Sequence, residues 1–211
     1  MDNITKMWMG PLPNDSPYVK PFRLYYVQNG VEKNWDLLKV HDSVAVILYN
    51  STRRVLIFVR QFRPAVYHSK YTACGYDAAE IDLKRVRPNI GITLELCVGI
   101  LDTDKGLHQN AREAVLEECG YDVPLDGFEQ VMSYRSGVGS FGAAEWMFYS
   151  EVTDDDQVTK GGGVGDEIIE VVEYTIPEAA NLLSKGGKVN SPPSCLLGIA
   201  WFLMNKAPKK N

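Results

Sequence analysis

Residues 99–121 read GILDTDKGLHQNAREAVLEECGY, the most informative stretch of this 211-residue sequence. A glycine-started loop leads into a short helical period that stops at Gly120, because glycine just past a helix is a common C-terminal stop. Ala111, Val115 and Cys119 recur at i, i+4 spacing and predict an apolar stripe that packs on a sheet. The glutamates of the segment lie mainly off that stripe, so the sequence predicts a helix with one buried and one acidic face.

Three of these glutamates, Glu113, Glu117 and Glu118, lie close together on the expected helix. Neighbouring carboxylates repel one another unless a cation lies among them, and hard Mg²⁺ prefers such oxygen ligands. On an arbitrary amphipathic helix, a Glu-Glu pair is more often a solvated face. Here the glycine-containing loop before the helix and the Cys-Gly-Tyr after it favour a divalent-cation site, with Mg²⁺ as the expected ion and Mn²⁺ as the alternative.

The same segment resembles a Nudix box, whose pattern is G-x5-E-x7-R-E-U-x-E-E-x-G-U, with U a bulky apolar residue. Gly99, Glu117, Glu118, Gly120 and Tyr121 match it in register. The resemblance runs from about residue 16 to residue 207 and is closest to the ADP-ribose and nucleoside diphosphate sugar branch of the Nudix family. The segments that carry it include SPYVKPFRLYYVQNG, VRQFRPAVY, SGVGSFG and GGGVGDEIIEVVEY.

The segment departs from the box pattern at two places. Lys105 replaces the mid-loop glutamate, and the Arg-Glu pair comes one position early, so that Ala114 stands where the pattern has glutamate. At about 100° per residue, Glu113 lies about 40° beyond Glu117 and about 140° from Glu118 on a straight α-helix, which removes one ligand. A single π-helical turn would absorb one residue and bring Glu113 back. Alternatively, its long side chain and water would complete the metal shell from where it stands.

The resemblance also implies roles for residues outside the helix. The backbone carbonyl before the box glycine, here that of Val98, is a metal ligand in family members. Arg63 would bind the diphosphate, because a guanidinium forks onto phosphate oxygens. Glu167 matches a glutamate proposed to orient or deprotonate the attacking water, and Trp35 would stack on the base. Surface solvation of Arg63 and Glu167 and core packing of Trp35 are the competing interpretations.

The remaining patterns predict an α+β class with mostly strands. Asn29-Gly30, a strong hairpin signal, separates residues 22–28 from residues 31–40. Further strands are expected at residues 43–49, 55–62, 92–98, 128–134, 145–152 and 167–176, and helices at 111–119, 177–184 and 195–205. Residues 67–89 read as a long loop or insertion, 136–142 as a flexible loop and 154–166 as a mobile one.

With the resemblance, we expect a Nudix fold, a mixed-sheet α/β/α sandwich at residues 43–211. An N-terminal β extension at residues 1–42 would mediate dimerisation.

Composition excludes several other classes of protein. The net charge of −5 leaves no basic surface for nucleic acid beyond Lys206, Lys209 and Lys210 of the tail. The four cysteines form no C-x-x-C pair, which argues against zinc. No signal peptide and no stretch approaching ~20 apolar residues is visible. We therefore expect a cytoplasmic protein without a nucleic-acid or membrane partner.

The resemblance implies a homodimeric, Mg²⁺-dependent hydrolase of a nucleoside diphosphate sugar, converting UDP-glucose to UMP and glucose 1-phosphate. Water is the expected nucleophile, because no G-x-S-x-G or comparable motif is present. Hydrolysis of ADP-ribose, a catalytically weakened nucleotide-sugar binder and a purely structural dimer module are the alternatives. The expected catalytic residues are Glu113, Glu117 and Glu167, the substrate-binding residues Arg63 and Trp35, and the metal ligands Glu117, Glu118, Glu113 and Val98.

Overall fold

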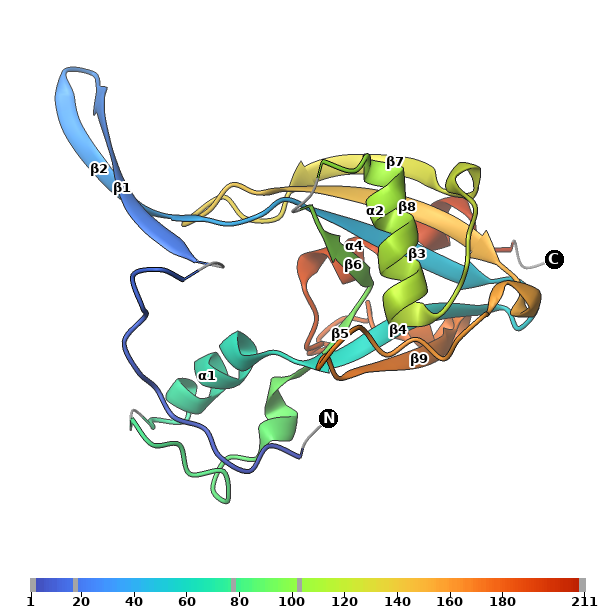
Figure 1. Cartoon of the computed structure of the whole chain (residues 1–211), viewed down its shortest axis with the longest axis horizontal. Coiled ribbons are helices and arrows are strands. Elements are labelled where there is room, and N and C mark those ends of the chain that lie inside the picture. The colour runs from blue at the N-terminus through green and yellow to red at the C-terminus, as the bar shows by residue number, and fades with distance from the viewer. Residues whose placement is uncertain (1–2, 17–18, 77–78, 102–103, 209–211) are drawn as a thin grey trace.

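The computed structural model describes residues 3–16, 19–76, 79–101 and 104–208, so Lys209, Lys210 and residues 102–103 of the box loop lie outside it. A mixed sheet dominates the described part (Figure 1). Its strand order is β5-β4-β3-β8-β7, with β6 also beside β3 and β9 beside β4. The strands are β3 (Ser43–Asn50), β4 (Val55–Phe62), β5 (Ile92–Glu95), β6 (Cys97–Ile100), β7 (Glu129–Arg135), β8 (Ala144–Val152) and β9 (Ile169–Thr175). The central pair β3–β8 is parallel, and the other pairs are antiparallel.

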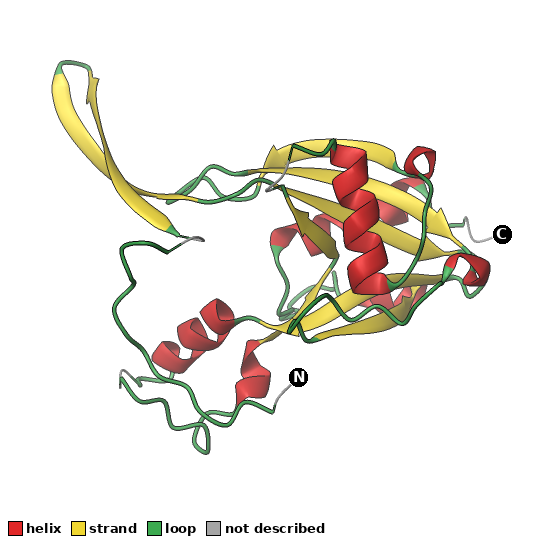
Figure 2. Ribbon diagram, in the orientation of Figure 1, coloured by secondary structure: helices red, strands yellow, loops and turns green. Residues whose placement is uncertain are grey.

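Alternate residues of β3 divide the core between the two faces of the sheet, because successive side chains of a strand point in opposite directions. Val44, Val46 and Leu48 belong to the apolar cluster that includes helix α2 (Leu107–Ala114) and the turn that follows it. Ala45 and Ile47 belong to the opposite cluster, with α3 (Ile176–Asn181) and α4 (Pro193–Asn205). Figure 2 shows α2 crossing one face of the sheet. The expected α/β/α sandwich is confirmed.

Strands β3 and β4 pair over three residues, from Leu48 opposite Ile57 to Asn50 opposite Val55. Beyond this point β5 continues along β4 and β6 along β3. The single strand expected at residues 92–98 is therefore wrong. The segment is divided at Leu96, which is 1% exposed, into β5 and β6. The chain crosses there from the edge of β4 to the edge of β3, because these two strands diverge.

The N-terminal hairpin consists of β1 (Lys20–Gln28) and β2 (Val31–Lys39), and it stands away from the main sheet (Figure 1). Asn29 and Gly30 take φ values of 54° and 78°, as the predicted turn requires. On β2, the Leu38 amide donates to the Ser140 carbonyl at 2.7 Å and Trp35 Nε1 donates to the Gly139 carbonyl at 2.9 Å. The loop at residues 136–142, expected to be flexible, is thus bonded to the second strand of the hairpin.

The loop expected at residues 67–89 is wrong at its two ends, whereas the described residues between Ala73 and Pro88 form no helix or strand. Helix α1 (Pro64–Ala73) begins at the proline, and the 3-10 turn η1 (Pro88–Gly91) leads into β5. Tyr67 and Tyr71 lie one helical turn apart and are buried against Ile81 and Val86. Proline at a first helical position and the i, i+4 tyrosine pair are the signals that the sequence reading missed. Within the described ranges, no helix has the length and apolar character needed to cross a membrane.

Candidate active site

A cavity of about 400 Å³ lies between the end of β4, strand β6, helix α2 and the glycine-rich loop before β9. Its walls combine carboxylates with two cationic side chains and several backbone groups. The lining residues are Gln61, Arg63, Val98, Gly99, Ile100, Lys105, Asn110, Glu113, Ala114, Glu117, Glu118, Val164 and Glu167.

Helix α2 does not end at Ala114 but continues as a π-helical turn, Val115–Cys119 (η2). A π-turn accommodates one extra residue, which is the shift that the early position of Glu113 requires. Glu113 lines the same cavity as Glu117 and Glu118. Of the two ways of retaining Glu113 at the site, the structure contains the π-turn.

Ala114, where the box pattern has glutamate, is a packing residue. It is 6% exposed and faces Gly99 of β6. A Cβ on Gly99 would lie 3.0 Å from the Ala114 Cβ and 3.3 Å from the Asn110 carbonyl oxygen. The helix therefore approaches β6 where both residues are small, and this contact sets the distance of the glutamates from the strand.

The carbonyl end of η2 is capped by the glycine-rich loop. Gly120 follows the helix with φ 80°. The Gly162 amide donates to the Glu118 carbonyl at 2.9 Å, and the Gly163 amide donates to the Glu117 carbonyl at 3.0 Å. The segment at residues 154–166, which was expected to be mobile, is thus bonded to the helix end, because its glycines supply the amides that satisfy the last carbonyls of the helix.

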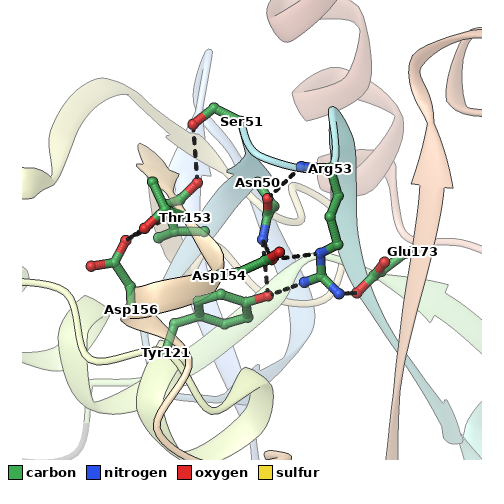
Figure 3. A network of polar contacts seen from close by, with 9 residues as sticks. Asn50, Ser51, Arg53, Tyr121, Thr153, Asp154, Asp156 and Glu173 are labelled. Atoms are coloured by element: carbon green, nitrogen blue, oxygen red, sulfur yellow. Dashed lines mark hydrogen bonds and ion pairs between the residues drawn. The ribbon is translucent and has the colours of Figure 1, made fainter.

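A polar network fixes the chain just after Gly120 (Figure 3). The Tyr121 hydroxyl accepts a hydrogen bond from Arg53 Nη2 at 2.5 Å. Arg53 also pairs with Asp154 and Glu173, each at 2.8 Å, and Asn50 donates to Asp154 at 2.8 Å. Arg53 thus ties the β3–β4 turn, the end of the glutamate helix, the loop after β8 and strand β9 to one another.

Glu118 is a partly buried glutamate of the cavity wall and lies beside strand β6. Burial raises the pKa of its carboxyl to about 7, although hydrogen bonds from the Val98 amide and the Cys97 thiol oppose the rise. The negative charges of Glu167 and Glu95 raise this pKa further. The Val98 amide donates to Glu118 Oε2 at 3.1 Å. A neighbouring cation would therefore favour the ionised form of this carboxyl.

Glu113 is engaged on both carboxylate oxygens. Lys105 Nζ lies 2.7 Å from its Oε2, and Gln109 Nε2 donates to its Oε1 at 2.8 Å. The Lys105 and Gln109 hydrogen bonds lower the pKa of Glu113. Among the described residues, no group of three His, Cys, Asp or Glu side chains is already placed to hold a metal ion. The donors are of the oxygen type that a hard divalent ion takes, but Glu113 must leave Lys105 and Gln109 to join the others.

Arg63 lies between the end of β4 and the start of α1, and a buried carboxylate holds its side chain. Its Nε and Nη2 donate to the two oxygens of Glu95 at 2.7 and 2.6 Å, and the Glu95 side chain is 6% exposed. This hydrogen-bonded pair raises the pKa of Arg63. The guanidinium is thus a fixed positive group in the cavity wall.

Comparison with known proteins identifies relatives of the whole chain. No family model matches. The chain is 40% identical over 204 residues to the uridine diphosphate glucose pyrophosphatase NUDT14 of Bos taurus, covering 92% of this chain and 91% of that protein. The Mus musculus protein of the same name is 37% identical with the same coverage, 92% and 91%. The GDP-mannose pyrophosphatase of Salmonella arizonae is 29% identical over 156 residues, 74% of this chain and 71% of that one.

The chain belongs to the Nudix hydrolase family. In this Nudix hydrolase, the cavity collects all but one of the residues expected at the site: Arg63, Val98, Glu113, Glu117, Glu118 and Glu167 line it. The exception is Trp35, which lies on the hairpin, is 54% exposed and does not line the cavity of its own chain. Whether Trp35 contacts a base stays a prediction.

Sequence reasoning missed two supporting residues of the Nudix site. Glu95, which holds Arg63, is a charged residue within the apolar stretch ITLELCV, and such a residue requires a partner when buried. Asn110 is 6% exposed on the inner side of α2, where a polar side chain must also be satisfied. In both cases the available signal was an acidic or amide side chain at a position where the neighbouring apolar residues predict burial.

Proposed function

We propose that this Nudix hydrolase cleaves the diphosphate bond of a nucleoside diphosphate sugar, with UDP-glucose as the favoured substrate and UMP and glucose 1-phosphate as products. The observation that carries the proposal is the single cavity in which four glutamates face the fixed guanidinium of Arg63. A bound divalent cation and a guanidinium both stabilise the negative charge of a diphosphate. The two NUDT14 relatives, named for UDP-glucose, support the choice of sugar nucleotide.

The proposed cofactor is Mg²⁺, with Mn²⁺ as the alternative, held by Glu117, Glu118, the Val98 carbonyl and, after it leaves Lys105, Glu113. The raised pKa of Glu118 supports this assignment, because burial beside other carboxylates makes its negative charge unfavourable without a cation. A bound divalent ion would neutralise the diphosphate and lower the pKa of a water molecule.

Arg63 and Glu167 are proposed to complete the reaction. Arg63 carries five N–H donors, and its fork to Glu95 leaves others to bind the phosphates. Glu167 Oε2 accepts from the Val164 amide at 3.0 Å at the rim of the same cavity. From there its carboxylate would rotate to orient and deprotonate the attacking water. Glu113 and Glu117 would act with it through the metal.

The direct test is hydrolysis of UDP-glucose and ADP-ribose, each with Mg²⁺ and with EDTA, followed by chromatography of the released nucleotides. We expect Mg²⁺-dependent release of UMP, with kcat/KM for UDP-glucose at least about tenfold above that for ADP-ribose. The reverse preference would contradict the sugar assignment. Thermal stabilisation by UDP-glucose without turnover would indicate a binding protein, and no response to either compound would indicate a structural module.

The hairpin supports a second proposal, that residues 1–42 mediate a homodimer with residues 43–211 as the hydrolase domain. An isolated two-stranded hairpin is at best marginally stable in water. Here both faces carry exposed apolar side chains, because Phe22 and Leu24 alternate with Tyr25 and Val27, and all four are between 48% and 70% exposed. A second copy of the chain would cover them. The cytoplasmic location, and the absence of nucleic-acid and membrane partners, stay predictions of the sequence.

We expect wild-type protein to elute at twice 23.6 kDa in size-exclusion chromatography with light scattering, and Val27→Glu to elute as a monomer. A carboxylate in an apolar interface loses its hydration without a partner, whereas in a monomer it stays in water. Lys33→Glu is the control, since it changes charge on the same hairpin at a polar position and should remain dimeric. A monomeric wild-type protein would contradict the proposal.

A further inference from the structure

Lys105 occupies the position of the box glutamate that this chain lacks, and its backbone is fixed beside the cavity. The amide of buried Asn110 donates to the Lys105 carbonyl at 3.0 Å and to the Gly106 carbonyl at 3.1 Å. The Asn110 backbone amide donates to Gly106 as well, at 3.1 Å. The loop thus presents the Lys105 side chain to the cavity from a defined point on the wall.

The Lys105 ammonium contacts a carboxylate that the proposed metal site requires. Its Nζ lies 2.7 Å from Glu113 Oε2, with the two side chains 48% and 33% exposed. While this contact lasts, Lys105 competes with a divalent ion for the same oxygen. The pair holds one cation that suits a phosphate and one carboxylate that suits a metal.

The two ion pairs in the cavity wall differ in how easily they separate. Lys105–Glu113 is half-exposed, and pairs of this kind contribute little to stability. Arg63–Glu95 includes a carboxylate that is 6% exposed, so separating it would leave a buried charge without a partner. Substrate binding is therefore expected to leave Arg63 on Glu95 and to move Lys105.

We propose that Lys105 is a second phosphate-binding residue of this enzyme, and that the divalent ion and the diphosphate separate the Lys105–Glu113 pair when they bind. Glu113 then turns to the metal and Lys105 to a diphosphate oxygen, so each charge exchanges one partner for another of the same sign. This proposal rests on the proposed function, since it requires a diphosphate substrate.

The substitution Lys105→Met tests the exchange, because it keeps most of the side-chain volume and removes the charge. Without nucleotide, we expect its Kd for Mg²⁺, measured by titration calorimetry, to fall several-fold, since the competing ammonium is gone. The KM for UDP-glucose is expected to rise about tenfold or more, the size of a lost charge-assisted hydrogen bond. Opposite shifts of the two constants are the signature that a purely structural role would not produce.

Gln109→Met is the matched control, because it removes the other hydrogen bond to Glu113 without removing a charge. Its KM is expected to stay near the wild-type value. An unchanged KM in Lys105→Met would overturn the phosphate role, and unchanged or weaker Mg²⁺ binding would overturn the competition. If wild-type protein hydrolyses no nucleotide sugar, the proposed function fails. The calorimetric comparison would still decide whether Lys105 competes with the metal.

Discussion

Replacing Glu118 by glutamine is expected to lower kcat/KM for UDP-glucose by at least about 100-fold, because the amide cannot supply the negative charge that the proposed divalent ion requires. The same substitution is expected to stabilise the metal-free protein above pH 7. Burial raises the pKa of Glu118 from 4.5 to about 7. At neutral pH and above, the folded protein therefore contains an unfavourable buried charge, and glutamine removes it.

The pH dependence follows from the direction of this shift. Below about pH 4.5 Glu118 is protonated in both the folded and the unfolded chain, so it contributes no pH-dependent destabilisation. Between pH 4.5 and about pH 7 the unfolded chain ionises first, and the penalty grows to at most about 3 kcal/mol. The excess in melting temperature of Glu118→Gln over wild type should thus be small at pH 5 and reach at most roughly 6 to 12 °C at pH 8.

Glu117→Gln separates the two effects, because Glu117 is an exposed neighbour on the same turn. It should reduce activity without raising the melting temperature. Adding Mg²⁺ should stabilise wild type and not Glu118→Gln. Wild-type activity in Glu118→Gln would contradict the proposed metal-binding role of this carboxylate. A lower melting temperature at pH 8 would contradict the cost of burying its charge.

Replacing Gly161 by alanine is expected to destabilise the protein by at least about 3 kcal/mol, combining a left-handed backbone with a steric overlap. Gly161 has φ 64°, and an added Cβ would collide with the Glu118 carbonyl oxygen and lie 2.7 Å from its carbon. The loop would have to move away, breaking the bonds from the Gly162 and Gly163 amides to the helix. Because the loop also carries Glu167, turnover at permissive temperature should fall about 100-fold.

Gly165 provides a close control for this substitution. Its φ is 63°, yet a Cβ there would meet nothing within 4 Å. Gly165→Ala should therefore cost only the backbone term of about 1 to 2 kcal/mol, and turnover should be much closer to wild type. Chemical denaturation of both variants, followed by single-turnover assays, measures the difference. Equal losses would show that the contact with the helix end is unimportant.

The elements predicted well are those whose signals are local. The Asn29-Gly30 turn, the strand at Val55–Phe62 and the apolar stripe of Ala111, Val115 and Cys119 each follow from neighbouring residues. The division at Leu96 could not be predicted in this way, because it depends on how far β3 and β4 diverge. The capping role of Gly162 and Gly163 likewise depends on a helix about forty residues earlier in the chain, as the Gly162–Glu118 bond shows.

The residues of the site show the same difference between signals in neighbouring residues and contacts between distant segments. Family resemblance indicated the glutamates and Arg63, and the register of Glu113 raised the hypothesis of a π-turn that the structure contains. The partners of these residues were not predicted, because the Lys105–Glu113 and Arg63–Glu95 pairs join separate segments. A residue type indicates which chemistry is available, whereas the competing contacts of that residue require coordinates.

The parallel pairing of β3 with β8 has a consequence for the order of folding. Ser43 and Glu145, which bond at one end of this pair, are 102 positions apart, and the whole glutamate helix lies on the intervening chain. Closing so long a segment costs entropy that local contacts cannot repay. During synthesis the helix therefore has no complete β3–β8 pair to pack on until Val152, the last residue of β8, has left the ribosome. Nascent chains arrested before that residue should remain protease-sensitive at the helix.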